Sequence, residues 1–152
     1  MMGKLAERLS DAERSGVYRV ETTEALEEAA VLNGFPLVRV ALDGAADDEL
    51  CALCARVLTP GLDGSWRGLA AALADPGWSL APGHVLLFSG FETLARAAPR
   101  ALDPLLDALR SVAAGRRARG QPFFAAFLDR AGSLPLGPLY NWHRQSKSQQ
   151  SV

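Results

Sequence analysis

The sequence predicts an α/β fold in which a small, mainly parallel sheet is flanked by helices. Three segments rich in β-branched, aromatic and other apolar residues, at 37–42, 85–88 and 123–128, are separated by stretches with helical periodicity. The 85–88 segment is apolar throughout, which is typical of a strand covered on both faces. Because strands that alternate with helices pair in parallel through crossovers, we expect 85–88 in the centre with the other two beside it.

The first half of the chain also predicts a further strand and four helices. Most of the helices begin with acidic or capping residues and end at Gly or Pro, which suits the helix dipole and the conformations of those residues. The helices are expected at 3–14, 24–32, 47–57 and 66–74, and the strand at 17–20. Thr22 or Thr23 is the expected cap of the second helix, and Ser65 that of the fourth.

The second half predicts a short helix at 91–97 and a long one from Leu102 that ends at Gly120. The long helix has an apolar stripe with a 3.6-residue period, made of Leu105, Leu106, Leu109 and Val112. We therefore divide the chain into an N-terminal helix at 1–15, one α/β domain at 16–129 and a C-terminal extension at 130–152. The polar end of that extension is expected to be disordered.

Composition excludes several classes of protein. The 152 residues are 49% hydrophobic and 22% charged, which is close to the globular average and excludes wholesale disorder. The formal net charge of −1 argues against a nucleic-acid binder, and two cysteines are too few for a disulfide-built scaffold. The charged N-terminus and the short apolar runs predict a cytoplasmic protein that does not enter membranes.

The cysteine pair Cys51-x-x-Cys54 raises the alternative of a thiol redox protein. Asp47, Asp48 and Glu49 precede it in the first turn and would raise a thiol pKa, and Cys54 falls on an apolar helical stripe. A zinc site would need His84 and His143 to converge on the two cysteines. We instead expect His84 to be a hydrogen-bonded edge residue at the start of a strand. We expect no catalytic residue, no metal and no cofactor.

Arginines gather at the end of the long helix, where the dipole favours cations. They are Arg110, Arg116, Arg117 and Arg119. The alternative interpretation is a binding site for an acidic protein or for nucleic acid. No aromatic residues are interleaved with these arginines, so stacking on single-stranded nucleic acid has little support.

From Gly16 to Leu128, the order of elements and several anchor residues resemble the barstar family of small intracellular ribonuclease inhibitors. The anchors are Gly16-Val-Tyr-Arg, Ala25-Leu26 to Gly34-Phe35, Val38-Arg39-Val40, the 50–58 and 66–73 helices, Trp78, Gly83-His-Val-Leu-Leu, the 105–119 helix and Gly120-Gln-Pro-Phe-Phe. The resemblance implies a three-layered α/β fold and a role in protein binding.

The family's docking segment, Phe-Pro-x-x-Phe-Gly-x-Asn-Trp-Asp-Ala-Leu, corresponds here to residues 59–69. Pro60, Trp66 and Leu69 match it, whereas Arg67 and Ala71 stand where the family has acids. Those acids imitate RNA phosphate in a cationic active site, so an arginine there reverses the sign of the interaction. Inhibition of a barnase-like ribonuclease is therefore not expected.

We thus expect a non-enzymatic protein–protein interaction module of the immunity or antitoxin type. Its expected partner is a toxin, and a nuclease is one kind of toxin that would fit. The sequence leaves its oligomeric state open. The residues expected to bind the partner are Leu62, Asp63, Ser65, Arg67, Ala71, Arg116 and Arg119. Two alternatives remain. One is a degenerate barstar-like paralogue that binds an acidic protein or nucleic acid through its arginines, and the other is a thiol redox protein that uses Cys51 and Cys54.

Overall fold

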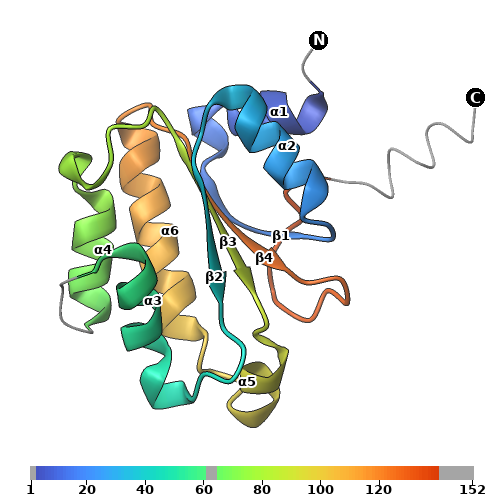
Figure 1. Ribbon diagram of the computed structural model, residues 1–152, viewed down its shortest axis with the longest axis vertical. Coiled ribbons are helices and arrows are strands. Elements are labelled where there is room, and N and C mark those ends of the chain that lie inside the picture. Colours follow the sequence, from blue (N-terminus) through green and yellow to red (C-terminus); the bar gives the residue numbers. More distant parts are fainter. Residues whose placement is uncertain (1–2, 61–64, 141–152) are drawn as a thin grey trace, which may run out of the picture.

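The computed structural model, which describes residues 3–60 and 65–140, has a four-stranded parallel sheet between two layers of helices (Figure 1). The strands are β1 (Gly16–Val20), β2 (Leu37–Ala41), β3 (His84–Ser89) and β4 (Phe123–Leu128). Their order across the sheet is β1-β4-β3-β2, and all three pairings are parallel. The fold class and the central place of 85–88 are confirmed.

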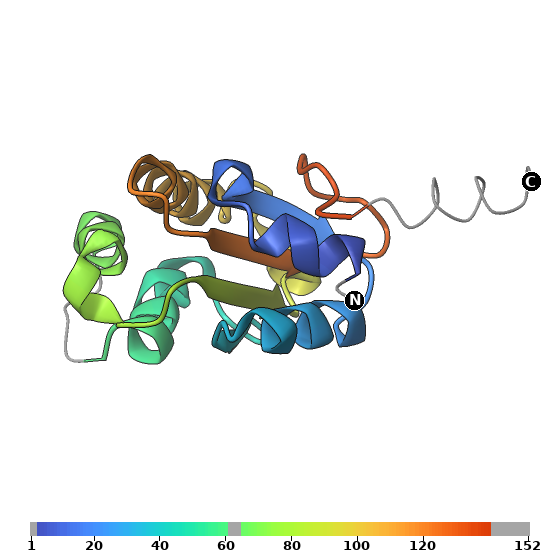
Figure 2. The same ribbon diagram turned by 90° about the horizontal axis from the view of Figure 1, so that it is seen from above.

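Helices cover both faces of the sheet, as the view from above shows (Figure 2). On one side lie α1 (Lys4–Leu9) and α2 (Glu24–Asn33), and on the other α3 (Leu50–Leu58), α4 (Trp66–Ala74) and α6 (Asp103–Ala118). The short α5 (Glu92–Ala97) follows β3 at the carboxyl end of the strands. Three 3₁₀ turns, at Ala12–Arg14, Asp47–Glu49 and Pro76–Trp78, join these elements.

The alternation of side chains along β3 and β4 creates two hydrophobic cores. Leu86, Phe88 and Phe127 point to the larger core, which α3, α4 and α6 cover. Val85 and Leu87 point to the smaller core under α1 and α2. Because successive strand residues face opposite sides of a sheet, a wholly apolar run is required to fill both cores.

Element boundaries differ from the predictions in a few places. The predicted helix at 3–14 is divided into α1 and a 3₁₀ turn, because the side chain of Asp11 accepts a hydrogen bond from the backbone N–H of Glu13 and starts a new turn. The predicted helix at 47–57 likewise begins as a 3₁₀ turn before α3. Thr23 is at the N-cap of α2, but its side chain makes no capping bond.

The described part of the C-terminal extension packs against the edge of β1. Asp129 is buried, and its carboxylate accepts hydrogen bonds from the backbone N–H groups of Ser133 and Leu134 and from the Ser133 hydroxyl. Leu139 is fully buried in the smaller core. The predicted disorder concerns residues beyond Tyr140, which lie outside the described ranges.

Candidate partner-binding surface

The candidate surface is built on α4, which corresponds to the predicted docking helix. The Ser65 hydroxyl oxygen accepts a hydrogen bond of 3.0 Å from the backbone N–H of Gly68, so the predicted cap is confirmed. Leu69 and Leu73 are buried in the larger core, and this leaves Arg67 and Ala71 exposed on the outward side. The remaining two predicted residues of this segment, Leu62 and Asp63, lie outside the described residues.

Arg67 is a solvent-exposed cation in the first turn of α4. Within residues 3–60 and 65–140, its side chain forms no ion pair and no hydrogen bond. The N-terminal end of a helix carries a positive partial charge, so a cation there is disfavoured by the dipole. In the described part of the chain, the start of α4 therefore presents an exposed guanidinium beside the N–H groups of the first turn, of which the Ser65 hydroxyl binds that of Gly68.

A surface pocket of about 550 Å³ adjoins α4. Its walls come from the end of α3, from Ala72 of α4 and from the turn after α4, and they comprise Leu58, Thr59, Pro60, Ala72, Asp75, Gly77 and Trp78. The indole N–H of Trp78 donates a hydrogen bond of 2.9 Å to the Leu58 carbonyl, which holds the two walls together. The pocket thus combines apolar walls with one exposed carboxylate, that of Asp75.

Arg116 holds the other end of α4 and is only 1% exposed. Its guanidinium donates hydrogen bonds of 2.6 and 3.2 Å to the Leu73 carbonyl, one of 3.3 Å to the Asp75 carbonyl and one of 3.0 Å to Gln121. It also lies over the ring of Trp78, 5.9 Å from the centroid. The prediction that Arg116 contacts a partner is therefore wrong, because its donors satisfy the last carbonyls of α4.

Arg119 is exposed and also serves α4. It donates a hydrogen bond of 2.6 Å to the Ala74 carbonyl, while Arg117 donates one of 3.3 Å to the Ser15 carbonyl. The arginine cluster therefore joins the end of α6 to neighbouring backbone rather than forming a free cationic patch. Its place at a helix end agrees with the sequence, but its function is to cap the C-terminus of a second helix.

His84 opens β3 as predicted, and its side chain is buried. Among the described residues its Nε2 has no hydrogen-bond partner, and its ring lies 4.8 Å from that of Trp78. Burial, and secondarily the charge of Arg116, lower the pKa of His84 from 6.5 to about 4. The ring is therefore neutral at pH 7 and packs as an aromatic group under α4.

The cysteine pair does not form a reactive centre at Cys54. That side chain is fully buried in the larger core, and burial, with the nearby Cys51, raises the pKa of its thiol to about 12. Among the described residues, no group of three His, Cys, Asp or Glu side chains could hold a metal ion. Within the same ranges, no helix is long and apolar enough to cross a membrane.

A sequence-based view missed the contact between Trp78, His84 and Arg116. One signal was present: Arg116 lies four residues after Val112, in the same register as Leu105 and Leu109. That spacing places it on the buried stripe of α6. In comparisons with family models, curated proteins and solved structures, nothing matches the chain.

Proposed function

We propose that the chain is a non-enzymatic protein-binding module, of the immunity or antitoxin type, that docks its partner on the outward side of α4. Three features support this proposal. The resemblance to the barstar family puts the docking segment at this helix, a pocket adjoins it, and Arg67 is an exposed cation that the described residues leave unpaired. The last of these carries the proposal, because none of the described residues gives Arg67 a structural role.

The partner's docking surface is acidic. A guanidinium pairs with a carboxylate through two parallel hydrogen bonds, and the start of the helix adds its own positive potential to that of Arg67. Arg56 of α3 is a further exposed cation on a helix next to α4. A cationic nuclease cleft would be repelled by these charges, so the proposed partner offers carboxylates instead.

A ribonuclease assay tests the polarity of this surface. We expect no inhibition of a barnase-type ribonuclease by the unaltered chain, and at most partial inhibition by the double variant Arg67→Asp with Ala71→Asp. The double variant restores the two acids that the family has at these positions. Tight inhibition by the unaltered chain would show that other acids, Asp63 first among them, replace the missing pair and that the partner is cationic.

Site-specific crosslinking tests the surface itself. A photoreactive residue at Ala71 should capture a partner from extracts of the source cells, and Arg67→Glu should abolish that capture. The same residue at Thr93, an exposed position on α5, is the matched control. Capture at both positions, or capture at Ala71 that survives Arg67→Glu, would contradict a docking role for this side of α4.

A further inference from the structure

The two edges of the sheet differ in what covers them. At β1, the backbone N–H of Arg19 donates a hydrogen bond of 2.9 Å to the Gly137 carbonyl, and the Arg19 carbonyl accepts one of 3.0 Å from the N–H of Leu139. The extended segment 137–139 therefore occupies that edge. No described segment pairs with the outer edge of β2, which faces the viewer between α2 and α3 (Figure 1).

The register of β2 determines which backbone groups lie at this edge. The Pro36 carbonyl accepts a hydrogen bond of 3.0 Å from Val85, and the N–H of Leu42 donates one of 2.8 Å to Ser89. Alternate residues of a strand in a parallel pair bond to the same neighbour, so the even-numbered residues of β2 face β3. The residues whose N–H and carbonyl groups point outward are Leu37, Arg39 and Ala41.

We propose that a second copy of this chain pairs with this edge, strand β2 antiparallel to strand β2, about a twofold axis between the two Arg39 residues. In this register Arg39 pairs with itself and Leu37 with Ala41 of the second copy. Each outward N–H then finds an outward carbonyl. A register centred on Val38 would require the N–H of Phe35, which already donates a hydrogen bond of 2.9 Å to the Ala30 carbonyl.

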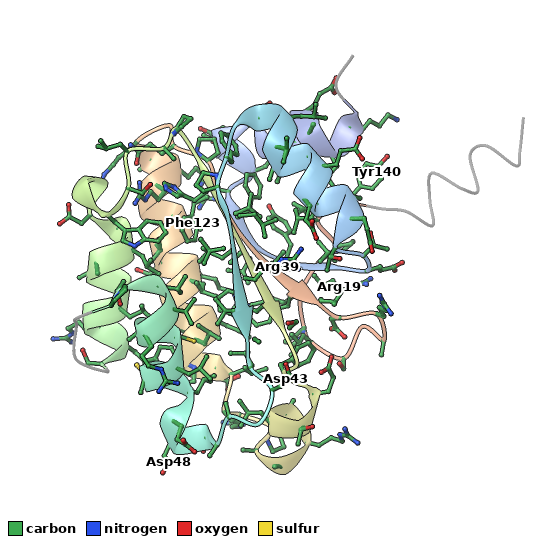
Figure 3. The ribbon with its side chains drawn as sticks, in the orientation of Figure 1. Arg19, Arg39, Asp43, Asp48, Phe123 and Tyr140 are labelled. Atoms are coloured by element: carbon green, nitrogen blue, oxygen red, sulfur yellow. The ribbon has the colours of Figure 1, made fainter. Side chains whose placement is uncertain are left out.

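The charges beside the axis are self-complementary. Arg39, labelled in Figure 3, forms an ion pair with Glu27 of α2. Both side chains are about half exposed. Two arginines directly opposite each other would destabilise a strand pair, but here each brings a carboxylate with it. The twofold axis creates a cluster of two guanidinium and two carboxylate groups with no net charge. An acidic or basic peptide would disturb that balance, whereas a second copy preserves it.

Apolar surface beside the edge adds to the interface. Val31 lies one turn after Glu27 on the same side of α2 and is 76% exposed. Leu37 contributes a partly buried side chain on the same face of the sheet. The interface lies away from the candidate surface on α4, because α2 and α4 cover opposite faces of the sheet. The inference is therefore independent of the proposed function.

Sedimentation of the full chain from micromolar to near-millimolar concentration tests the proposal. We expect a monomer–dimer equilibrium that Arg39→Glu weakens about tenfold or more, because four acidic groups then meet at the axis. Arg110→Glu is the matched control, since Arg110 is also an exposed arginine in an ion pair. A monomer at every concentration would overturn the proposal and would leave the edge to a strand of another protein. A dimer that responds equally to both variants would also overturn it.

Disulfide trapping gives a second measurement that does not depend on a charge reversal. In a Cys51→Ser background, Arg39→Cys should form a disulfide-linked dimer upon mild oxidation, because hydrogen-bonded antiparallel residues have Cα atoms about 5.5 Å apart. Arg110→Cys should crosslink far more slowly. Equal rates for the two variants would overturn the proposed axis.

Discussion

Replacing Arg116 by Met tests whether the buried guanidinium holds α4 against the rest of the fold. The change keeps most of the side-chain volume and removes every donor. The Leu73 carbonyl then loses both of its guanidinium hydrogen bonds, whereas the Asp75 carbonyl keeps the one from the N–H of Trp78. Hydrogen bonds from a charged donor contribute about 1.5–3 kcal/mol each, so the two bonds to Leu73 decide the loss. The gross loss is thus roughly 3–6 kcal/mol, and release from the cost of burying a cation offsets part of it.

We expect Arg116→Met to lower the free energy of unfolding by about 3 kcal/mol, measured by urea denaturation with an unchanged m-value. Arg117→Met is the control in the same helix. Its exposed side chain makes one hydrogen bond of 3.3 Å, so its loss should cost less than about 1 kcal/mol. Equal effects of the two substitutions would refute the view that the guanidinium of Arg116 holds the end of α4.

We predict three further outcomes for side chains that are buried or partly buried. Because the folded pKa of His84 lies below the ordinary value, protonation favours unfolding. The free energy of unfolding should fall by up to about 3 kcal/mol from pH 6.5 to pH 4, and His84→Phe should lack that part of the slope in urea titrations. Trp66→Ala should lower the free energy of unfolding by about 2 kcal/mol, less than for a fully buried Trp, in the same assay. Cys54 should resist alkylation by iodoacetamide until the chain unfolds, and rapid modification of the native protein would contradict its burial.

The strands and helices were predictable because their signals are local. An apolar run such as 85–88 has few alternatives to a strand covered on both faces. The observed bounds of α4 agree with the predicted helix at 66–74, because Ser65 caps its start and Asp75 follows its end. Boundaries were less predictable at 10–14 and 47–49, where one side chain or one turn decides between a 3₁₀ and an α conformation.

Long-range contacts were not predictable in the same way. The pairing of Arg19 with the segment 137–139 joins residues more than a hundred positions apart, and no local pattern indicates it. Likewise, the surroundings of His84 depend on where Trp78 and Arg116 meet in space. For Arg116 the periodicity of α6 is consistent with burial, but its position at a helix end favoured the expectation that it faces a partner.

Three arginines lie at the two ends of α4. At its C-terminus, Arg116 and Arg119 donate to the last carbonyls and neutralise the negative end of the dipole. At its N-terminus, Arg67 adds a positive charge to an end that is already positive. Among the described residues, the helix therefore presents an uncompensated positive charge at its N-terminal end, whereas the pocket lined by Ala72, Asp75 and Trp78 lies toward its C-terminal end. A carboxylate docked at the N-terminal end would gain from the guanidinium and from the N–H groups together, and this is why the acidic partner follows from the position of Arg67 rather than from the number of arginines.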